Sequence, residues 1–262
     1  MMNKKTKRKF HIKKIICILL WTLLAMGAGT IYAWSKDHDE PHPYIDIAND
    51  DTYVMSFLGD SLTYGKRSRH TYTEYLGALC EADVIHNYGL SKNELSTAGD
   101  FIMPMCVRYQ EIDPASDFIM IWGGTNDWFH DIVLGVPADT NTTTFYGALH
   151  QTMQGLCDTY PQARIVFVTP MKRIRDGDVH MTNLNGNTLE EFANAIVTAG
   201  KSYSRIEVID LYHDKTCDFT KDTDYDTYWS DGLHPKSAGH EIIAQRMYEL
   251  LFQLSATDVI SQ

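Results

Sequence analysis

Three side chains, separated by most of the sequence, have the chemistry of a hydrolytic triad. Ser61 follows Gly59 at the end of an apolar segment, where a sharp turn of the backbone would leave the hydroxyl exposed. Asp231 stands three residues before His234 with a glycine between them, so its carboxylate can reach the imidazole within one turn. A serine nucleophile needs a base to take its proton, and the base needs a group that holds its tautomer. The pattern predicts Ser61 as nucleophile, His234 as base and Asp231 as the residue that orients the base.

Each of these residues also has an ordinary structural interpretation. A serine in the position of Ser61 often caps a helix or a turn. Asp231 is suited to capping the last helix, with Pro235 in its first turn and His234 on the surface. Neither segment is specific by itself, so the hydrolytic interpretation depends on both segments occurring together.

The elements that must position these residues follow from the hydrophobic pattern. Short apolar segments predict five buried strands, at Tyr53–Leu58, Val84–His86, Phe118–Trp122, Ile165–Val168 and Ile206–Ile209. Helical spacing of apolar residues predicts helices around 72–79 and 243–254. Alternating strands and helices imply a parallel sheet with helices on both faces, and such a sheet binds ligands beyond the carboxyl ends of its strands. The polar clusters at 59–61, 87–89 and 123–127 should therefore meet at one edge.

The chain resembles the SGNH or GDSL-type hydrolases in four blocks that occur in that family's order. The blocks are Gly59-Asp60-Ser61-Leu62, Asn87-Tyr88-Gly89, Gly124-Thr125-Asn126-Asp127 and Asp231-Gly232-Leu233-His234-Pro235. Each block is weakly specific, whereas the ordered set, which covers Tyr53 to Leu254, is strongly specific. The resemblance implies a serine esterase, lipase or acylhydrolase without a cofactor or a metal. It also implies an α/β fold of the flavodoxin-like kind, a three-layer α/β/α sandwich around a parallel sheet of about five strands.

The same resemblance implies an oxyanion hole made by the backbone N–H groups of Ser61 and Gly89 and the side chain of Asn126. One departure lies in the second block, where many relatives have a further glycine and this chain has Ser91 and Lys92. We expect this departure to change the width and polarity of the cleft and to leave Gly89 as a donor. The chain has no G-x-S-x-G motif, so the α/β-hydrolase fold is not supported.

The first 51 residues predict export of the domain that follows. Residues 1–14 form a basic segment with seven Lys or Arg residues, and residues 15–34 are an uncharged run that would span about 30 Å as a helix. The basic flank predicts a cytoplasmic N-terminus, and residues 35–51 form a linker to a hydrolase domain at 52–262, outside the membrane. The length favours an uncleaved single-pass anchor. Cleavage after Ala33, as in a signal peptide, would give a secreted protein instead.

Charge and cysteine content narrow the choice of partners. The chain has a net charge of −11, and its first 33 residues carry seven basic and no acidic side chains, so the remaining domain is more acidic still, at −18. A surface of this sign disfavours nucleic acid and anionic lipid, leaving membrane contact to the N-terminal segment. Export permits disulfides among Cys80, Cys106, Cys157 and Cys217, but free thiols are equally compatible with the sequence. The oligomeric state is left open.

Two other classes of function compete with the esterase. A metal-dependent phosphoesterase could use Asp60, Asn126, Asp127, Asp231 and His234, although the chain has few histidines in ligand spacing. A non-catalytic glycan-binding module would not need the complete set of Ser, Gly, Asn, Asp and His.

Aromatic residues bear on the substrate. Trp122 is expected in the core, whereas Trp128, Phe129, Tyr228 and Trp229 fall near the predicted active edge, where they could stack on sugar rings or line an acyl pocket. With the predicted export, they favour an acylated carbohydrate or glycan as the substrate, with lipids and small soluble esters as rivals.

Overall fold

A parallel sheet of five strands forms the centre of the computed structural model, which describes residues 52–99, 103–172, 181–219 and 225–260. The strands are β1 (Val54–Gly59), β2 (Val84–Gly89), β3 (Phe118–Trp122), β4 (Arg164–Val168) and β5 (Ile206–Ile209). Their order across the sheet is β2-β1-β3-β4-β5. All five predicted strands are confirmed. The strand β2 extends to Gly89, because the polar end of this segment still pairs with β1.

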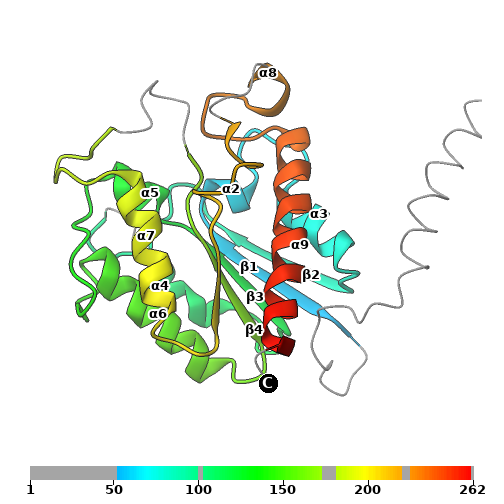
Figure 1. Ribbon diagram of the computed structural model, residues 1–262, viewed down its shortest axis with the longest axis horizontal. Helices are drawn as coiled ribbons and strands as arrows, with labels where there is room; N and C mark the ends of the chain where they lie inside the picture. Colours follow the sequence, from blue (N-terminus) through cyan, green and yellow to red (C-terminus); the bar gives the residue numbers. More distant parts are fainter. Residues whose placement is uncertain (1–51, 100–102, 173–180, 220–224, 261–262) are drawn as a thin grey trace, which may run out of the picture. The chain divides into compact units, whose positions relative to one another are not determined.

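Helices cover both faces of this sheet (Figure 1). On one face α3 (Tyr72–Leu79) packs against α9 (Ser237–Ile260). On the other face lie α4 (Met105–Arg108), α6 (Phe145–Thr159) and α7 (Leu189–Gly200), of which α6 contacts both α4 and α7. Shorter elements are α2 (Ser61–Tyr64), the 3-10 helix η1 (Tyr109–Glu111), α5 (Thr125–Phe129) and α8 (Tyr225–Tyr228). The predicted three-layer α/β/α sandwich is confirmed.

The core follows the hydrophobic pattern of the strands. Every residue of β1, β3 and β4 is buried, as expected for central strands of a parallel sheet covered on both faces. Trp122 is 2% exposed and packs edge-on against Tyr72, with ring centroids 5.0 Å apart. The prediction that Trp122 belongs to the core is therefore confirmed.

The register of the sheet explains why distant polar residues meet. Gly59 at the end of β1 is paired with Gly89 of β2 on one side and with Trp122 of β3 on the other. The three strands therefore end at the same level, and the segments that follow them emerge together. Two of the short helices, α2 and α5, begin directly beyond this edge.

The remaining sequence predictions concern cysteines and membrane segments. Cys80, Cys106, Cys157 and Cys217 are free thiols in the structure. Burial raises the pKa of Cys106 and of Cys217 to about 12, so both are inert thiols at neutral pH. No helix within the described ranges is long and apolar enough to cross a bilayer. The predicted segments at 1–14, 15–34 and 35–51 lie outside the described residues.

Candidate active site

Ser61 is the first residue of α2 and follows the turn at the end of β1. The residue that caps this helix is Asp60, whose Oδ1 accepts the backbone N–H of Leu62 at 2.9 Å. A Cβ atom on Gly59 would lie 2.0 Å from Thr63 Oγ1, so the turn requires glycine there. Because Asp60 does the capping, the Ser61 hydroxyl is available for other contacts. The backbone N–H of Ser61 has no partner among the described residues.

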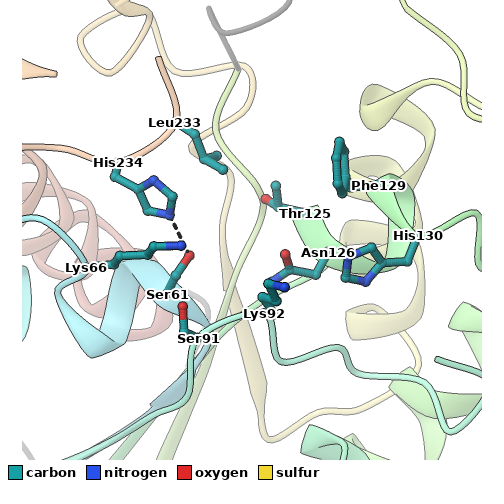
Figure 2. A pocket seen from close by; sticks show the side chains of 10 residues that line it. All are labelled: Ser61, Lys66, Ser91, Lys92, Thr125, Asn126, Phe129, His130, Leu233 and His234. Carbon is teal, nitrogen blue, oxygen red and sulfur yellow. Dashed lines mark hydrogen bonds between the residues drawn. The ribbon is translucent and has the colours of Figure 1, made fainter. Parts of the chain in front are cut away.

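The three residues predicted as a triad lie in one hydrogen-bonded line. Ser61 Oγ is 2.9 Å from His234 Nε2, a contact between residues 173 positions apart in the sequence (Figure 2). The other ring nitrogen, His234 Nδ1, lies 2.9 Å from Asp231 Oδ2 and 3.0 Å from Asp231 Oδ1. Ser61 is 6% and His234 is 4% exposed, which shields the contact between them from water. The alternative in which His234 is a surface residue is wrong.

The loop that carries Asp231 is built to hold this carboxylate against the imidazole. Asp231 Oδ1 accepts the backbone N–H of His234 at 2.9 Å and that of Leu233 at 3.2 Å. Arg67 Nε lies 3.1 Å from Asp231 Oδ2. Burial would raise the pKa of Asp231, but hydrogen bonds from the ring and backbone of His234 outweigh it and leave the pKa below its usual range. Asp231 is therefore ionised at neutral pH.

Burial also sets the charge state of the imidazole. It lowers the pKa of His234, against the opposing effect of Asp231, and the positive charges of Lys66 and Arg67 lower this pKa further. The ring is therefore neutral at neutral pH. With Nδ1–H donating to Asp231, the neutral ring presents Nε2 as an acceptor to the Ser61 hydroxyl.

The structure corrects the predicted role of Gly89. Its backbone N–H donates to Asn87 Oδ1 at 2.9 Å, and Gly89 is absent from the pocket beside Ser61. A Cβ atom on Gly89 would lie 2.1 Å from the backbone nitrogen of Tyr64, so glycine is needed for β2 to approach α2. The glycine of the second block thus serves packing, and its N–H is already bonded.

Lys92 occupies the place in the pocket that was expected of Gly89. It lies in the loop after β2 with φ of 67°, in the left-handed region where glycine is favoured. Both Lys92 and Ser91 line the pocket with Ser61, and the backbone N–H of Lys92 has no partner within the described ranges. The departure from the glycine of many relatives therefore falls at a position whose backbone conformation suits glycine.

Asn126 lies beside Ser61, as predicted, but its amide is already engaged. Its Nδ2 donates to Asp60 Oδ2 at 3.1 Å and to the backbone oxygen of Asn93 at 3.0 Å. Asn126 is the second residue of α5, so its position is set by the end of β3. Both amide hydrogens have protein partners, and one of these bonds must be exchanged if the side chain is to donate to a substrate.

Two buried carboxyl groups, those of Asp60 and Asp127, hold the segments of the site together through hydrogen bonds. Asp127 Oδ1 accepts the backbone N–H groups of Leu95 and Ser96, at 3.1 and 2.9 Å, which ties the loop after β2 to α5. Burial raises the pKa of Asp60 and of Asp127 to about 7 in each case.

Within the described ranges, no group of three or more His, Cys, Asp or Glu residues is arranged to hold a metal ion.

These residues surround a pocket that is partly open to solvent (Figure 2). Most of the residues that line it are of polar or charged types, and the full set is Ser61, Lys66, Ser91, Lys92, Thr125, Asn126, Phe129, His130, Leu233 and His234. Of the aromatic residues expected near the edge, Phe129 reaches the pocket and is 49% exposed, whereas Trp128 and Trp229 are buried.

Several residues of the site carry no recognisable signal in the sequence. Lys66, Lys92 and His130 line the pocket, and Arg67 contacts Asp231, but none of them belongs to a block that carried the resemblance. Of these four residues, only Lys92 stands out in the sequence, as a departure from the glycine pattern. Single basic residues are common in loops, so their sequence context alone could not distinguish them.

Comparison with known proteins agrees with this geometry. Residues 57–242 match the family described as the GDSL-like Lipase/Acylhydrolase family. The chain matches none of the curated protein sequences with which it was compared.

Solved structures extend the likeness to the whole domain. A protein from Lactobacillus plantarum is 30% identical over 77% of this chain and 97% of its own, with a TM-score of 0.70. A possible lipase from Chitinophaga pinensis is 25% identical over 77% of this chain and 98% of its own, with a TM-score of 0.59. An acetyl-xylooligosaccharide esterase from Geobacillus Stearmophilus, in a mutant form, shares the fold at 19% identity, over 79% of this chain and 96% of its own, with a TM-score of 0.55.

Proposed function

The chain belongs to the GDSL-like lipase/acylhydrolase family and is a serine-dependent ester hydrolase, and on that premise we propose that Ser61, His234 and Asp231 are its catalytic triad. The observation that carries the proposal is the line of contacts from Ser61 Oγ to His234 Nε2 at 2.9 Å and from His234 Nδ1 to Asp231 Oδ2 at 2.9 Å. A neutral imidazole and an ionised carboxylate are the charge states that this mechanism requires.

The reaction proceeds in two halves on these residues. Ser61 Oγ attacks the ester carbonyl carbon while His234 Nε2 takes the hydroxyl proton, and the carbonyl π electrons move to its oxygen. The tetrahedral intermediate collapses, the bond to the alcohol oxygen breaks, and His234 returns the proton to the departing alcohol. Water then repeats the sequence on the acyl group of Ser61, releasing the carboxylic acid. Asp231 stabilises the imidazolium in both halves.

The developing oxyanion would be held by donors from three segments. The backbone N–H of Ser61 at the start of α2 and the amide of Asn126 are two of them. The backbone N–H of Lys92 is our candidate for the third, in place of Gly89, because it has no partner among the described residues and its residue lines the pocket. Oxyanion donors of this kind stabilise the transition state more than the ground state.

We expect Asn126→Ala to lower kcat by on the order of 10²–10³ with little change in KM, because the lost amide acts mainly on the oxyanion. Steady-state kinetics on an aryl ester measure both constants. Asn185→Ala, which removes an exposed amide whose Nδ2 contacts Asp131 instead, is the matched control and should leave kcat unchanged. An increase in KM at constant kcat would contradict the oxyanion role.

The pH dependence follows from the lowered pKa of His234. The ring must be neutral to act as a base, so kcat/KM should rise with pH through an ionisation below 6.5 and be level at neutral pH. Lys66→Met removes a positive charge that disfavours the imidazolium, so it should raise this pKa and move the rise to higher pH. Lys201→Met, at the end of α7, is the control. A shift to lower pH in Lys66→Met would contradict the assignment of this limb to His234.

Covalent labelling distinguishes the serine mechanism from the competing classes. A fluorophosphonate should add one adduct to the wild-type chain, located on Ser61 by peptide mapping, and none to Ser61→Ala. A chelator should leave hydrolysis unchanged. Loss of activity in chelator without phosphonate labelling would support the metal-dependent phosphoesterase. Glycan binding with neither labelling nor turnover would support a binding module.

For the substrate, we propose an acylated carbohydrate or glycan. Support comes from the hydrogen-bonding and charged side chains that line the pocket together with Phe129 and Leu233. A protein of the same fold acts on acetyl-xylooligosaccharides. Rates of the purified full-length chain on acetylated oligosaccharides, lysophospholipids and aryl esters of graded chain length test this proposal, and preference for long chains would overturn it.

For the location, we propose that the domain lies outside the cytoplasm, anchored by residues 15–34. The basis is the uncharged run and the seven basic residues before it. Protease added to intact cells should remove the domain, and the chain should sediment with membranes. Soluble protein in the medium that begins near Trp34 would show instead that the segment is a cleaved signal peptide.

A further inference from the structure

A second imidazole–carboxylate pair lies on the wall of the same pocket. His130 lines the pocket, and its Nδ1 is hydrogen-bonded to Glu94 Oε1. Figure 2 shows His234 beside Ser61 on one side of the pocket and His130 on the other side, with Asn126 between them. The triad proposed above does not use this second pair.

Two segments of the fold bring the pair together. His130 directly follows α5 as its C-cap, and its backbone N–H donates to the carbonyl of Asn126, one helical turn earlier, at 2.8 Å. Glu94 belongs to the loop after β2, next to Asn93, whose backbone oxygen accepts the Asn126 amide. The pair is thus held by the same contacts that position the proposed oxyanion donors.

Glu94 is buried without a second partner. Its side chain is 1% exposed, and its Oε2 has no hydrogen-bond partner among the described residues. A Cβ atom on Gly99 would lie 1.7 Å from this oxygen, so a glycine makes room for the carboxylate. Burying a carboxyl group costs free energy, and an incompletely paired one calls for a functional explanation.

The bond to Glu94 determines what the ring can offer to the pocket. With Nδ1 engaged, Nε2 is the remaining ring nitrogen, and it has no partner within the described ranges. The neutral ring, with its proton on Nδ1, accepts a hydrogen bond at Nε2, and a protonated ring donates one there. A hydroxyl group fits both states because it donates and accepts, whereas a carboxylate fits only the protonated ring.

The position of the pair also indicates which half of the ester it contacts. His234 must hand its proton to the alcohol oxygen, so the alcohol departs on the His234 side of the pocket. The carbonyl oxygen points to the donors around Asn126. The acyl chain is the substituent left to extend toward the opposite wall, which carries His130 (Figure 2).

We propose that His130, oriented by Glu94, is a specificity-determining residue that binds a hydroxyl on the acyl group, so that the protein prefers hydroxyacyl esters to their unsubstituted counterparts. The inference rests on the proposed function of Ser61. It assigns to His130 a contact with substrate and to Glu94 a positioning role through the ring.

The test compares two esters that differ by one hydroxyl. The 3-hydroxybutyryl and butyryl esters of one aryl alcohol are hydrolysed by the purified full-length chain, with Ser61→Ala as the blank. We expect kcat/KM of the wild type to favour the hydroxyacyl ester by about tenfold, the range of one hydrogen bond. His130→Phe should reduce this ratio to about one, mainly through a higher KM for the hydroxyacyl ester.

Further variants distinguish the loss of the hydroxyl contact from a general disturbance of the pocket. His130→Gln keeps a hydrogen-bonding group and should retain part of the preference. Glu94→Gln, which removes the carboxylate that orients the ring, should lose part of it. His86→Phe is the matched control, because His86 is also paired with a carboxylate, Asp113, but lies outside the pocket lining, and it should keep the full ratio.

The outcomes are distinct. An unchanged ratio in both His130 variants, an equal fall on both esters in both variants, or the absence of any preference in an active wild type overturns this inference alone. Wild-type rates no greater than those of Ser61→Ala overturn the proposed function and this inference with it.

Discussion

Ser61→Ala and His234→Ala each reduce kcat for ester hydrolysis by on the order of 10⁵, and the double variant is scarcely slower than either single variant: this is the largest effect we expect. The reason is the 2.9 Å contact between Ser61 Oγ and His234 Nε2, through which the two side chains act as one unit. Without the base the hydroxyl is a poor nucleophile, and without the hydroxyl the base has nothing to activate. Initial rates on an aryl ester, corrected for the uncatalysed reaction, measure the loss.

The controls for this prediction are substitutions of the same kinds elsewhere. Ser202→Ala, after α7, and His86→Ala, in β2, should retain wild-type kcat. Thermal unfolding checks that the triad variants are folded, since Ser61 and His234 are both buried. Full activity in folded Ser61→Ala would eliminate the serine mechanism and return the metal-dependent phosphoesterase as the leading alternative. Rate losses that multiply in the double variant would show that the two residues act independently.

Asp231→Asn is expected to lower kcat by on the order of 10³, the second largest effect. The asparagine can keep the bonds that Asp231 Oδ1 accepts from the backbone N–H groups of Leu233 and His234, so the loop should fold normally. The asparagine side chain has no negative charge to stabilise the imidazolium. Its NH₂ group can also donate to Nδ1, which favours the tautomer that is protonated on Nε2 and cannot accept the Ser61 proton. The loss is smaller than for Ser61 because the Asp231 side chain is 24% exposed and water can replace part of its effect.

The pH profile of the same variant gives an independent readout. Asp231 raises the pKa of His234 by stabilising the imidazolium, against the larger effect of burial. Removing the negative charge should therefore lower this pKa further, so that the residual activity of Asp231→Asn rises at lower pH than that of the wild type. A profile displaced to higher pH, or a kcat close to that of the wild type, would show that Asp231 does not orient the base. Asp158→Asn, on α6, is the control.

The triad could be predicted from the sequence because two of its three residues lie close together in the chain. Asp231 and His234 are three residues apart, and a glycine between them lets the carboxylate return to the ring within one turn. The third member, Ser61, is predicted by its place after an apolar strand. Strands buried on both faces are continuous apolar runs, so their ends, and the polar residues beyond those ends, are visible without a structure.

The oxyanion donors were only partly predictable, because a backbone N–H carries no sequence signal. Gly89 ends β2 and Lys92 lies three residues later, and the family resemblance favours the glycine. In the structure the N–H of Gly89 is taken by Asn87, and Lys92 lines the pocket with a left-handed backbone. Which N–H groups are bonded depends on how β2 packs against α2, and that is a property of the assembled sheet.

By itself, then, the sequence determined the family, the strands and the three side chains of the proposed triad, because these depend on residue type and on local or periodic spacing. The tertiary structure decided everything that depends on loops meeting across the sheet edge: the engagement of the Asn126 amide, the approach of Arg67 to Asp231, and the pairing of His130 with buried Glu94. Loop side chains have no periodicity, and their partners lie tens of positions away. Only the register that brings Gly59, Gly89 and Trp122 to one level puts those loops within hydrogen-bonding distance of one another.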